Sequence, residues 1–493
     1  MSTILRIVSV SVASAAALVL IVAISFAPPA TAATCKDPAA NVDPPPGSPV
    51  TSPSPTVRPP SARRPRGANE HAPLPRLGPL ISSLLGPIAR STAPVRQQAA
   101  AVPPAPSPPA AGAAPAPDAA PVPKAAPVPD AAPQPEPAEA AEPPPSIAGA
   151  PTSLVEWVTG PNSPNKTLDR FGISGTDLGI AWDNGDPTNS QVLMAFGDTF
   201  GYCRVHGQQW RYNTMFRSQD HDLSDGITVS NGVPSNIYSG SPETLPNFSK
   251  QLTPGIRLAR SQEGMIPTAG ISVGRNQYMN FMSIKQWGRD GEWSTNYSAL
   301  AVSRDNGQNW GIYPNTIRAT SPDSVPGVQY VPGNENFQMG AFMRGNDDYL
   351  YSFGTPSGRG GAIYLARVPQ AFVPDLTKYQ YWNGDQNTWV PGNPGAATPI
   401  IPGPAGEMSA QYNSYLKQYL LLYTNGASND VVARTAPAPQ GPWSPEQVLV
   451  SSFQMPGGIY APMIHPWSSG KDLYFNLSLW SAYDVMLMHT ALP

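Results

Sequence analysis

Short apolar runs separated by turn residues recur throughout residues 153–493, whereas apolar residues at helical spacing are almost absent. Such runs favour β-strands, because strand side chains alternate between two faces and Gly, Asn, Asp and Pro suit the intervening turns. The clearest predicted strands are residues 278–282, 298–302, 349–353, 362–366, 419–423 and 473–477. The sequence therefore predicts an all-β domain.

A longer unit repeats within this region. Each unit begins with a strand of small residues, continues with an aromatic strand and ends near an outer tryptophan, with starts near residues 177, 263, 337, 407 and 460. Five similar units in about 340 residues favour a five-bladed β-propeller with insertions, since a blade usually takes about 40–50 residues. A β-sandwich is the alternative.

One turn carries a specific pattern. Residues 303–310 fit Ser-x-Asp-x-Gly-x-x-Trp, which resembles the Asp-box of sialidase-type propellers. Asp305 is suited to accept hydrogen bonds from turn N–H groups, and Gly307 to supply a positive φ angle. We expect Trp310 to pack beneath the hairpin, so the predicted role of this turn is structural.

The chain before this domain has a different composition. Residues 34–151 form a Pro/Ala-rich tract, with 32 of the 63 prolines between Pro38 and Pro145. A tract with so few large apolar residues cannot offset the entropy cost of folding, so we predict a disordered, extended stalk. The globular domain is therefore expected at residues 152–493.

Residues 1–33 have the features of a secretory signal peptide. Arg6 precedes the apolar run from Ile7 to Phe26, and Ala30-Thr31-Ala32 is an A-x-A cleavage pattern. The run is also long enough to span a bilayer, so an uncleaved anchor is the alternative. We expect a secreted or envelope-associated protein.

Charge and cysteine content exclude several classes of function. Charged residues make up 13% of the chain, with a net charge of −3, which argues against a nucleic-acid partner. The two cysteines, Cys35 and Cys203, form no framework and no zinc-ligand spacing. We expect no metal, no cofactor and an uncharged polar ligand bound by a monomer.

Two aspartates are the leading catalytic candidates. Asp177 begins the predicted strand at residues 178–182, and Asp198 follows the one at residues 192–196. If these strands form an antiparallel hairpin, both carboxylates lie at one end of it, as general acid/base chemistry requires. Alternatively, both aspartates accept backbone hydrogen bonds in turns.

Other polar residues lie near the starts of the predicted inner strands, which converge at one mouth of a propeller. The candidate substrate-binding residues are Glu263, Gln338, Glu407 and Tyr460, together with Trp210, Arg211 and Asn213 after Asp198 and with His465. A carboxylate before an apolar strand is costly to bury without a reason, which favours a converging polar pocket. Two carboxylates flanking a sugar oxygen are the requirement for glycoside hydrolysis.

The motifs Gly-Thr-Asp177-Leu-Gly, Phe-Gly-Asp198-Thr-Phe, Trp-Arg211-x-Asn213 and Gly-Pro-Trp443 resemble those of an actinobacterial family. That family was long catalogued as a domain of unknown function and is now associated with endo-D-arabinofuranases of mycobacterial arabinogalactan and lipoarabinomannan. The resemblance covers about residues 153–493 and implies a five-bladed propeller glycosidase with Asp177 and Asp198 as the acid/base pair. At Tyr212 the chain departs from the family pattern, in which a smaller residue is expected beside the neighbouring subsite.

Two other functions are compatible with the sequence. A carbohydrate-binding or wall-anchoring propeller without turnover would suit the proline-rich stalk equally well. A sialidase-like enzyme fits less well, because it needs clustered arginines for the substrate carboxylate and the unit starts carry carboxylates instead. The preferred prediction is a secreted glycosidase that cleaves cell-envelope D-arabinan.

Overall fold

The computed structural model describes residues 147, 149–202, 209–253, 255–256, 258–288 and 292–493. The predicted signal peptide, nearly all of the Pro/Ala tract, Cys35 and Cys203 lie outside these residues. Strands dominate the described part, which contains one short α-helix, α4 (Thr167–Phe171). None of its helices is long and apolar enough to cross a bilayer.

The first two groups of antiparallel strands lie in the N-terminal half of the domain. The first sheet unit is β2 (Leu178–Asp183), β3 (Val192–Phe196) and β4 (Thr214–Ser218). The second is β7 (Gly264–Val273), β8 (Asn276–Trp287), β9 (Trp293–Ser303) and β10 (Gly311–Ile312), with β11 (Arg318–Ala319) also paired to β9. Between the units, β5 (Glu243–Leu245) pairs with β6 (Phe248–Ser249).

The third and fourth units are joined into one nine-stranded sheet by a short pairing between β14 and β17. The third unit is β12 (Met339–Arg344), β13 (Tyr349–Thr355) and β14 (Gly361–Pro369), extended by β15 (Gln380–Asn383) and β16 (Thr388–Pro391). The fourth is β17 (Ile401–Asn413), β18 (Gln418–Asn425), β19 (Val431–Ala436) and β20 (Gln447–Val450). Short 3-10 helices connect strands at η3 (Pro314–Thr316), η4 (Asn334–Phe337), η5 (Gln370–Phe372), η6 (Leu376–Lys378) and η7 (Pro394–Ala396).

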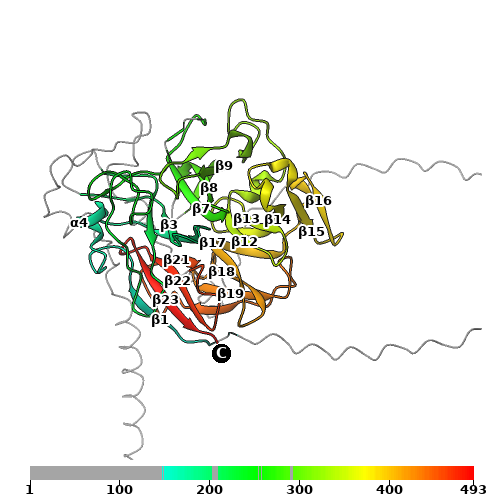
Figure 1. The fold of residues 1–493 in the computed structure, drawn as a ribbon. Helices are drawn as coiled ribbons and strands as arrows, with labels where there is room; N and C mark the ends of the chain where they lie inside the picture. The colour runs from blue at the N-terminus through cyan, green and yellow to red at the C-terminus, as the bar shows by residue number, and fades with distance from the viewer. Residues whose placement is uncertain (1–146, 148, 203–208, 254, 257, 289–291) are drawn as a thin grey trace, which may run out of the picture. The chain divides into compact units, whose positions relative to one another are not determined.

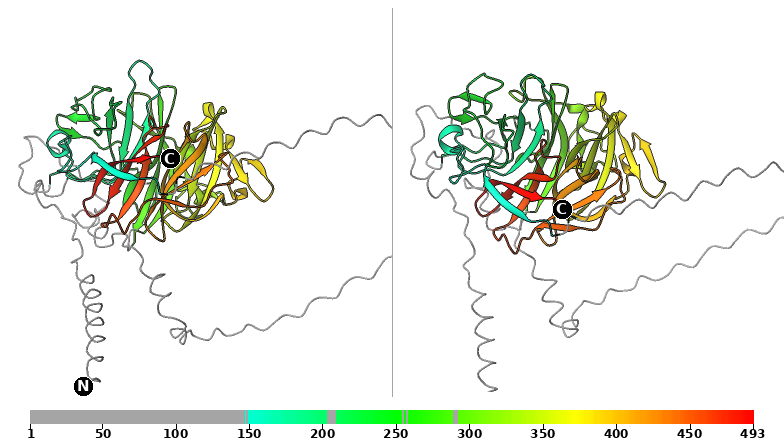
Figure 2. Two further views of the ribbon diagram at one scale, coloured as in Figure 1. Left: turned by 90° about the horizontal axis from the view of Figure 1, so that it is seen from below. Right: turned by 60° about the horizontal axis from the view of Figure 1, so that its bottom comes forward.

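The fifth unit combines both ends of the domain. It contains β21 (Ile459–Ile464), β22 (Asp472–Leu479) and β23 (Asp484–Ala491), and β1 (Thr152–Trp157) pairs antiparallel with β23. Figure 2 shows cyan β1 beside the red C-terminal strands. The last sheet is thus completed by the first strand of the domain.

The first strands of the five units contact one another in a ring. Strand β2 touches β7, and the contacts continue through β12 and β17 to β21, which touches β2 again. Figure 1 shows the labels β7, β12, β17 and β21 gathered near the middle of the domain. All six predicted strands coincide with observed strands, so the all-β prediction is confirmed. The predicted unit starts at residues 177, 263 and 337 lie one or two residues before β2, β7 and β12, whereas those at residues 407 and 460 lie inside β17 and β21. The five-bladed arrangement stays a prediction.

The core lies between neighbouring units. Strands β3 and β21 are buried along their whole length, because each is covered on both faces. The largest apolar cluster includes Trp182, Phe281 and Met463, which come from three different units. Each such side chain contributes about 1.5–3 kcal/mol when fully buried, so the packing of units against one another stabilises the domain.

The turn at residues 303–310 has the predicted hydrogen bonds. The Asp305 carboxylate accepts from the Ser303 hydroxyl at 2.7 Å and from the Asn309 N–H at 2.9 Å. Gly307 has a φ angle of 76°, and the Trp310 indole donates to its carbonyl at 3.0 Å. This turn therefore fixes the connection between β9 and β10.

Candidate active site

The β2–β3 hairpin brings the two predicted aspartates to one end. Leu178 pairs with Phe196 in the antiparallel register, and the Gly197 N–H donates to the Asp177 carbonyl at 3.2 Å. A Cβ at Gly197 would collide with the Asp177 carboxylate, so a larger residue there would displace that side chain. The predicted hairpin is therefore present, with Asp177 beginning one strand and Asp198 following the other.

Asp177 is held at an irregular point of the backbone. The residue after it, Leu178, has a φ angle of 73°, and the pairing with β3 shifts register between Leu178 and Ile180. Irregularities of this kind re-aim side chains at functional sites. The Tyr460 hydroxyl donates to Asp177 Oδ2 at 2.9 Å, whereas Oδ1 is buried without a hydrogen-bond partner among the described residues.

The electrostatic environment favours a proton on Asp177. Burial raises its pKa, the Tyr460 hydrogen bond lowers it, and the charge of Glu407 raises it again. Arg359 and Tyr483 oppose this increase, and the pKa settles at about 7. Asp177 is thus poised between its charged and neutral forms near neutral pH.

Asp198 is still more strongly biased toward its protonated form. It is 5% exposed, and the Trp210 indole donates to its Oδ1 at 2.8 Å. Burial and the neighbouring charge of Asp177 raise the pKa of Asp198 well above its usual value, although the Trp210 hydrogen bond lowers it. The two aspartates are therefore a coupled pair that is difficult to ionise twice.

A buried ion pair lies beside this carboxylate pair. Arg359 donates from Nε to Glu407 Oε2 at 2.9 Å and from Nη2 to Oε1 at 2.6 Å. Glu407 lies in β17, where the pairing with β18 shifts register between Ala405 and Met408. Sequence analysis identified Glu407 but missed Arg359, which lies in the short turn between β13 and β14 and has no motif around it.

Aromatic side chains surround these charges. Tyr460 is the second residue of β21, and the next residue, Ala461, has a φ angle of 56°, so the backbone is irregular here as well. Trp480 packs edge-on against Tyr460, with ring centroids 5.3 Å apart. Trp287 and Trp293 also pack against each other. The indole N–H groups of Trp287, Trp293 and Trp480 are buried without a hydrogen-bond partner in the part of the chain described. The surroundings thus contain aromatic rings and buried indole N–H groups that lack a partner in the described part of the chain.

Two predicted substrate-binding residues lie in the interior instead. Arg211 is fully buried and donates to the carbonyls of Phe171, Gly172 and Ser249. Asn213 is also fully buried and bonds to Thr253, Leu252 and the Met265 carbonyl. Side chains alternate along an extended segment, so when Trp210 faces Asp198 its neighbour Arg211 faces the other way. Their placement is that of structural residues.

Three further predicted residues have different surroundings. Gln338 is fully buried and accepts from Thr295 and Thr320 while donating to two backbone carbonyls. The Glu263 carboxylate accepts a hydrogen bond from the backbone N–H of Trp287 at 2.9 Å, at the end of the β7–β8 pair. His465 follows β21 at its far end and packs against Trp467, where burial lowers its pKa to about 3. The carboxylate cluster thus includes Asp177, Asp198, Glu407, Tyr460 and Trp210, but not Gln338 or His465.

A cavity of about 430 Å³ opens at the opposite ends of the inner strands. Its lining includes Asp183 at the end of β2, Arg344 at the end of β12 and Ile464 at the end of β21. It is therefore separate from the carboxylate cluster, which lies at the strand starts. Neither region has a group of three or more His, Cys, Asp and Glu suited to a metal ion, as far as the described residues extend.

Comparison with known proteins identifies the family. The family described as "Domain of unknown function (DUF4185)" matches residues 162–489, and the chain belongs to it. A curated relative, Notoamide biosynthesis cluster protein J from Aspergillus sp. (strain MF297-2), is 28% identical over 321 residues, covering 64% of this chain and 81% of the relative.

Solved glycosidases show a distant similarity. A glycosyl hydrolase from Bacteroides ovatus has a TM-score of 0.39 at 12% identity, covering 70% of this chain and 94% of the other. An alpha-L-arabinofuranosidase from Podospora anserina, solved in complex with cellotriose, has a TM-score of 0.35 at 13% identity, covering 71% and 98% respectively. These structural neighbours are glycoside hydrolases.

Proposed function

We propose that this member of the DUF4185 family is a glycoside hydrolase whose acid/base pair is Asp177 and Asp198. The observation that carries the proposal is the placement of two buried carboxyl groups at one hairpin end, where each raises the cost of ionising the other. Glycoside hydrolysis needs one protonated carboxylic acid and one carboxylate on either side of the scissile bond. A coupled pair that retains one proton near neutral pH provides both forms.

The environments of the two residues suggest their roles. Asp198 has the more strongly raised pKa, so we assign to it the protonated form that donates to the leaving oxygen. Asp177 receives the Tyr460 hydrogen bond and is close enough to Arg359 for that cation to favour its charged form. We therefore assign to Asp177 the ionised role, in which it acts on water or on the sugar carbon.

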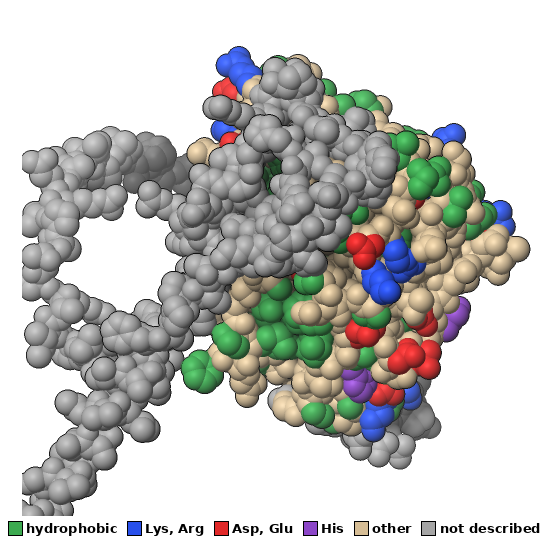
Figure 3. Space-filling view, turned by 90° about the vertical axis from the view of Figure 1, so that its left-hand side faces the viewer, with side chains coloured by type: hydrophobic (Ala, Val, Ile, Leu, Met, Phe, Trp, Pro, Cys, Tyr) green, Lys and Arg blue, Asp and Glu red, His purple; other side chains and the backbone are tan. Residues whose placement is uncertain are grey.

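The proposed substrate is D-arabinan of the mycobacterial cell envelope. The family resemblance around Asp177 and Asp198 supports this choice, as do the nearby tryptophan rings, whose indole N–H groups have no partner among the described residues. An uncharged ligand fits a site whose buried cation, Arg359, is already paired with Glu407. Lys, Arg, Asp and Glu are interspersed on the face in Figure 3, without a continuous basic patch in that view.

We also propose a five-bladed propeller for the domain and a location outside the cell. The ring of contacts among the first strands and the completion of the last sheet by β1 support the propeller. The sequence of residues 1–33 supports export, with the Pro/Ala tract as the stalk that links the domain to its point of attachment. An activity on envelope polysaccharide is consistent with this location.

The direct test is hydrolysis of purified arabinogalactan by the full chain. The proposal predicts that arabinose-containing oligosaccharides appear over time and that mass spectrometry detects them. The alternative is a carbohydrate-binding protein without turnover. Retention of the protein on immobilised arabinogalactan without any released oligosaccharide would support that alternative and refute the hydrolase.

A further inference from the structure

The β13–β14 turn places one arginine deep between two sheet units. The Arg359 side chain is only 10% exposed although it belongs to a Gly-Arg-Gly turn. Two glycines of the fourth unit make room for it, because a Cβ at Gly406 would lie 3.1 Å from Arg359 Cγ and one at Gly426 would collide with the Arg359 carbonyl. The position is therefore built into the packing of the two units.

Contacts fix the guanidinium in one orientation. The fork-shaped pairing with Glu407 uses both carboxylate oxygens, which gives a stronger and more directional bond than a single contact. The Arg359 Cζ atom also lies 4.8 Å from the Trp293 ring centroid and 5.3 Å from that of Tyr460. A cation over an aromatic face is stabilised by the ring quadrupole, so Arg359 restrains the ring whose hydroxyl binds Asp177.

We propose that Arg359 is a positioning residue of the active site, which holds Tyr460 against Asp177 and, together with Glu407, places a balanced pair of charges beside that carboxylate. This inference rests on the proposed function, since it assigns Arg359 a role in the same reaction.

The groups that face Asp177 come from five elements. They are Tyr460 in β21, Tyr483 before β23, Glu407 in β17, Arg359 in the β13–β14 turn and Asp198 after β3. Burial is the largest influence and raises the pKa of Asp177, but Glu407 and Arg359 act in opposite directions, since the anion raises it and the cation lowers it. Removing either charge alone should therefore shift the pKa of Asp177. Removing both charges should bring that pKa back close to its wild-type value.

The test is the pH profile of arabinogalactan hydrolysis by the full chain and three variants. The acid limb of kcat/KM reports the group that must be ionised in the free enzyme, here Asp177. We expect Arg359→Met to move this limb up by about one pH unit and Glu407→Gln to move it down by a similar amount. The double variant should have a limb close to that of the wild type.

Two further variants separate positioning from general damage. Arg359→Lys keeps the charge and should leave the limb nearer the wild type than Arg359→Met does. Arg434→Met removes a different ion pair, with Glu446 at 3.2 Å, and should leave the limb unchanged. If Arg359→Met and Glu407→Gln shift the limb in the same direction, or not at all, the positioning role is refuted.

A titration that needs no activity keeps the two proposals distinguishable. Carbon-13 NMR of the Asp177 carboxyl in the same full-length variants should show the same opposite shifts, with the double variant near the wild type. Absence of hydrolysis in the wild type at every pH would refute the hydrolase, and this titration would still decide the role of Arg359. An unchanged titration of Asp177 in both single variants would overturn the positioning role of Arg359.

Discussion

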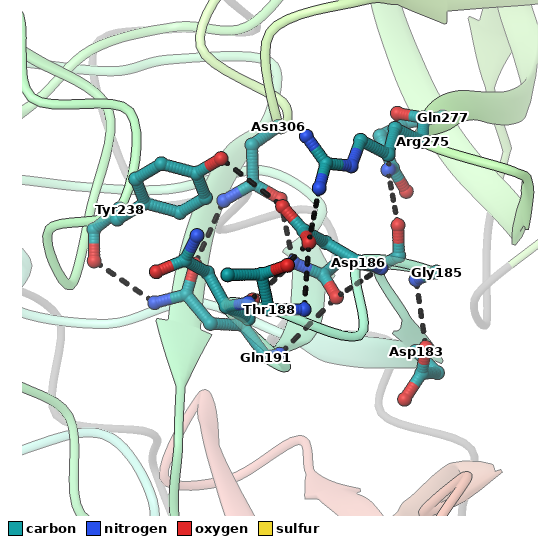
Figure 4. A network of polar contacts seen from close by, with 11 residues as sticks. Asp183, Gly185, Asp186, Thr188, Gln191, Tyr238, Arg275, Gln277 and Asn306 are labelled. Carbon is teal, nitrogen blue, oxygen red and sulfur yellow. Dashed lines mark hydrogen bonds and ion pairs between the residues drawn. The ribbon is translucent and has the colours of Figure 1, made fainter.

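The two ends of the β2–β3 hairpin carry aspartates in opposite situations. At the turn, Asp186 accepts from the Thr188 N–H at 2.9 Å and from the Tyr238 hydroxyl at 3.1 Å, and pairs with Arg275 at 3.0 Å (Figure 4). At the other end, Asp177 Oδ1 has no partner among the described residues, and the neighbouring carboxyl belongs to Asp198.

The pKa values follow this difference. Burial raises the pKa of Asp186, but the hydrogen bonds from Thr188, Tyr238 and Asn189 and the charge of Arg275 outweigh it, so the pKa lies below its usual value. Burial also raises the pKa of Asp177, and there the opposing contacts are too few to reverse it. One hairpin thus has a satisfied, structural end and an unsatisfied end whose carboxyl groups can still exchange a proton.

The largest expected effect is on catalysis. Asp198→Asn and Asp177→Asn should each lower kcat on arabinan by about 10²–10⁴-fold, because each removes one proton-transfer group. Asp186→Asn, at the satisfied end, should keep kcat near the wild-type value under conditions where it is folded. Activity in either active-site variant within a few-fold of the wild type would remove that residue from the mechanism.

Whereas Asp177→Asn should lower kcat, the same substitution should raise the free energy of unfolding above neutral pH. The pKa of Asp177 is about 7 in the folded protein against a usual value of 3.8, so the native state binds its proton more tightly than the unfolded chain does. The proton's contribution is complete below about pH 4 and is lost as pH rises through 7. Asp177→Asn should therefore be more stable than the wild type at pH 8, by up to about 4 kcal/mol.

Urea unfolding at pH 3 and pH 8 measures this change. The gain in the free energy of unfolding should nearly disappear at pH 3, where the wild-type carboxyl is protonated. A variant less stable than the wild type at pH 8 would contradict the raised pKa.

The satisfied end should lose stability without losing activity. Asn184 is fully buried, accepts from the Asp186 and Gln191 N–H groups and donates to Asn306. Asn184→Ala leaves those groups unpaired and should lower the free energy of unfolding by about 1–3 kcal/mol. Thermal unfolding would measure the loss of stability, and kcat measured below the unfolding transition would test whether activity is kept. A large loss of kcat in the folded variant would contradict a purely structural role for this end of the hairpin.

A pair of tryptophans gives the smallest expected effect. The Trp480 indole N–H has no partner among the described residues, whereas Trp182 donates to Gln277 at 2.9 Å. Trp480→Phe should lower kcat/KM by about two- to tenfold with little change in stability, because we expect this indole to donate to a substrate hydroxyl. Trp182→Phe should instead destabilise the fold by about 1–2 kcal/mol and leave kcat/KM unchanged. The reverse pattern would show that Trp480 is structural.

The strands of the fold and part of the candidate active site could be predicted from local sequence. Alternating and apolar runs located the strands, and Asp177 and Asp198 followed from their places beside two of them. Tyr460 was identified because it lies near the start of β21, and Glu407 because the sequence predicted a unit start there, although it lies in the middle of β17. These signals are local, since each depends on the residue and the strand next to it.

The missed and misplaced residues depend on packing between units. Arg359 lies in a turn of the third unit and meets Glu407 of the fourth, a contact that no local pattern reveals. Arg211 was predicted from its adjacency to Trp210, yet it is buried beneath α4 because alternate residues face opposite sides. His465 lies beyond the far end of β21, close to Asp220 and His221, and not at the start where Tyr460 lies.

The most direct test of the central claim is a carbon-13 NMR titration of the Asp177 and Asp198 carboxyl groups in the wild-type full chain between pH 3 and pH 10. The account predicts two separate steps for the pair, with one proton still bound near neutral pH, while Asp186 titrates below its usual range. Loss of both protons from the pair near pH 4 would contradict the account.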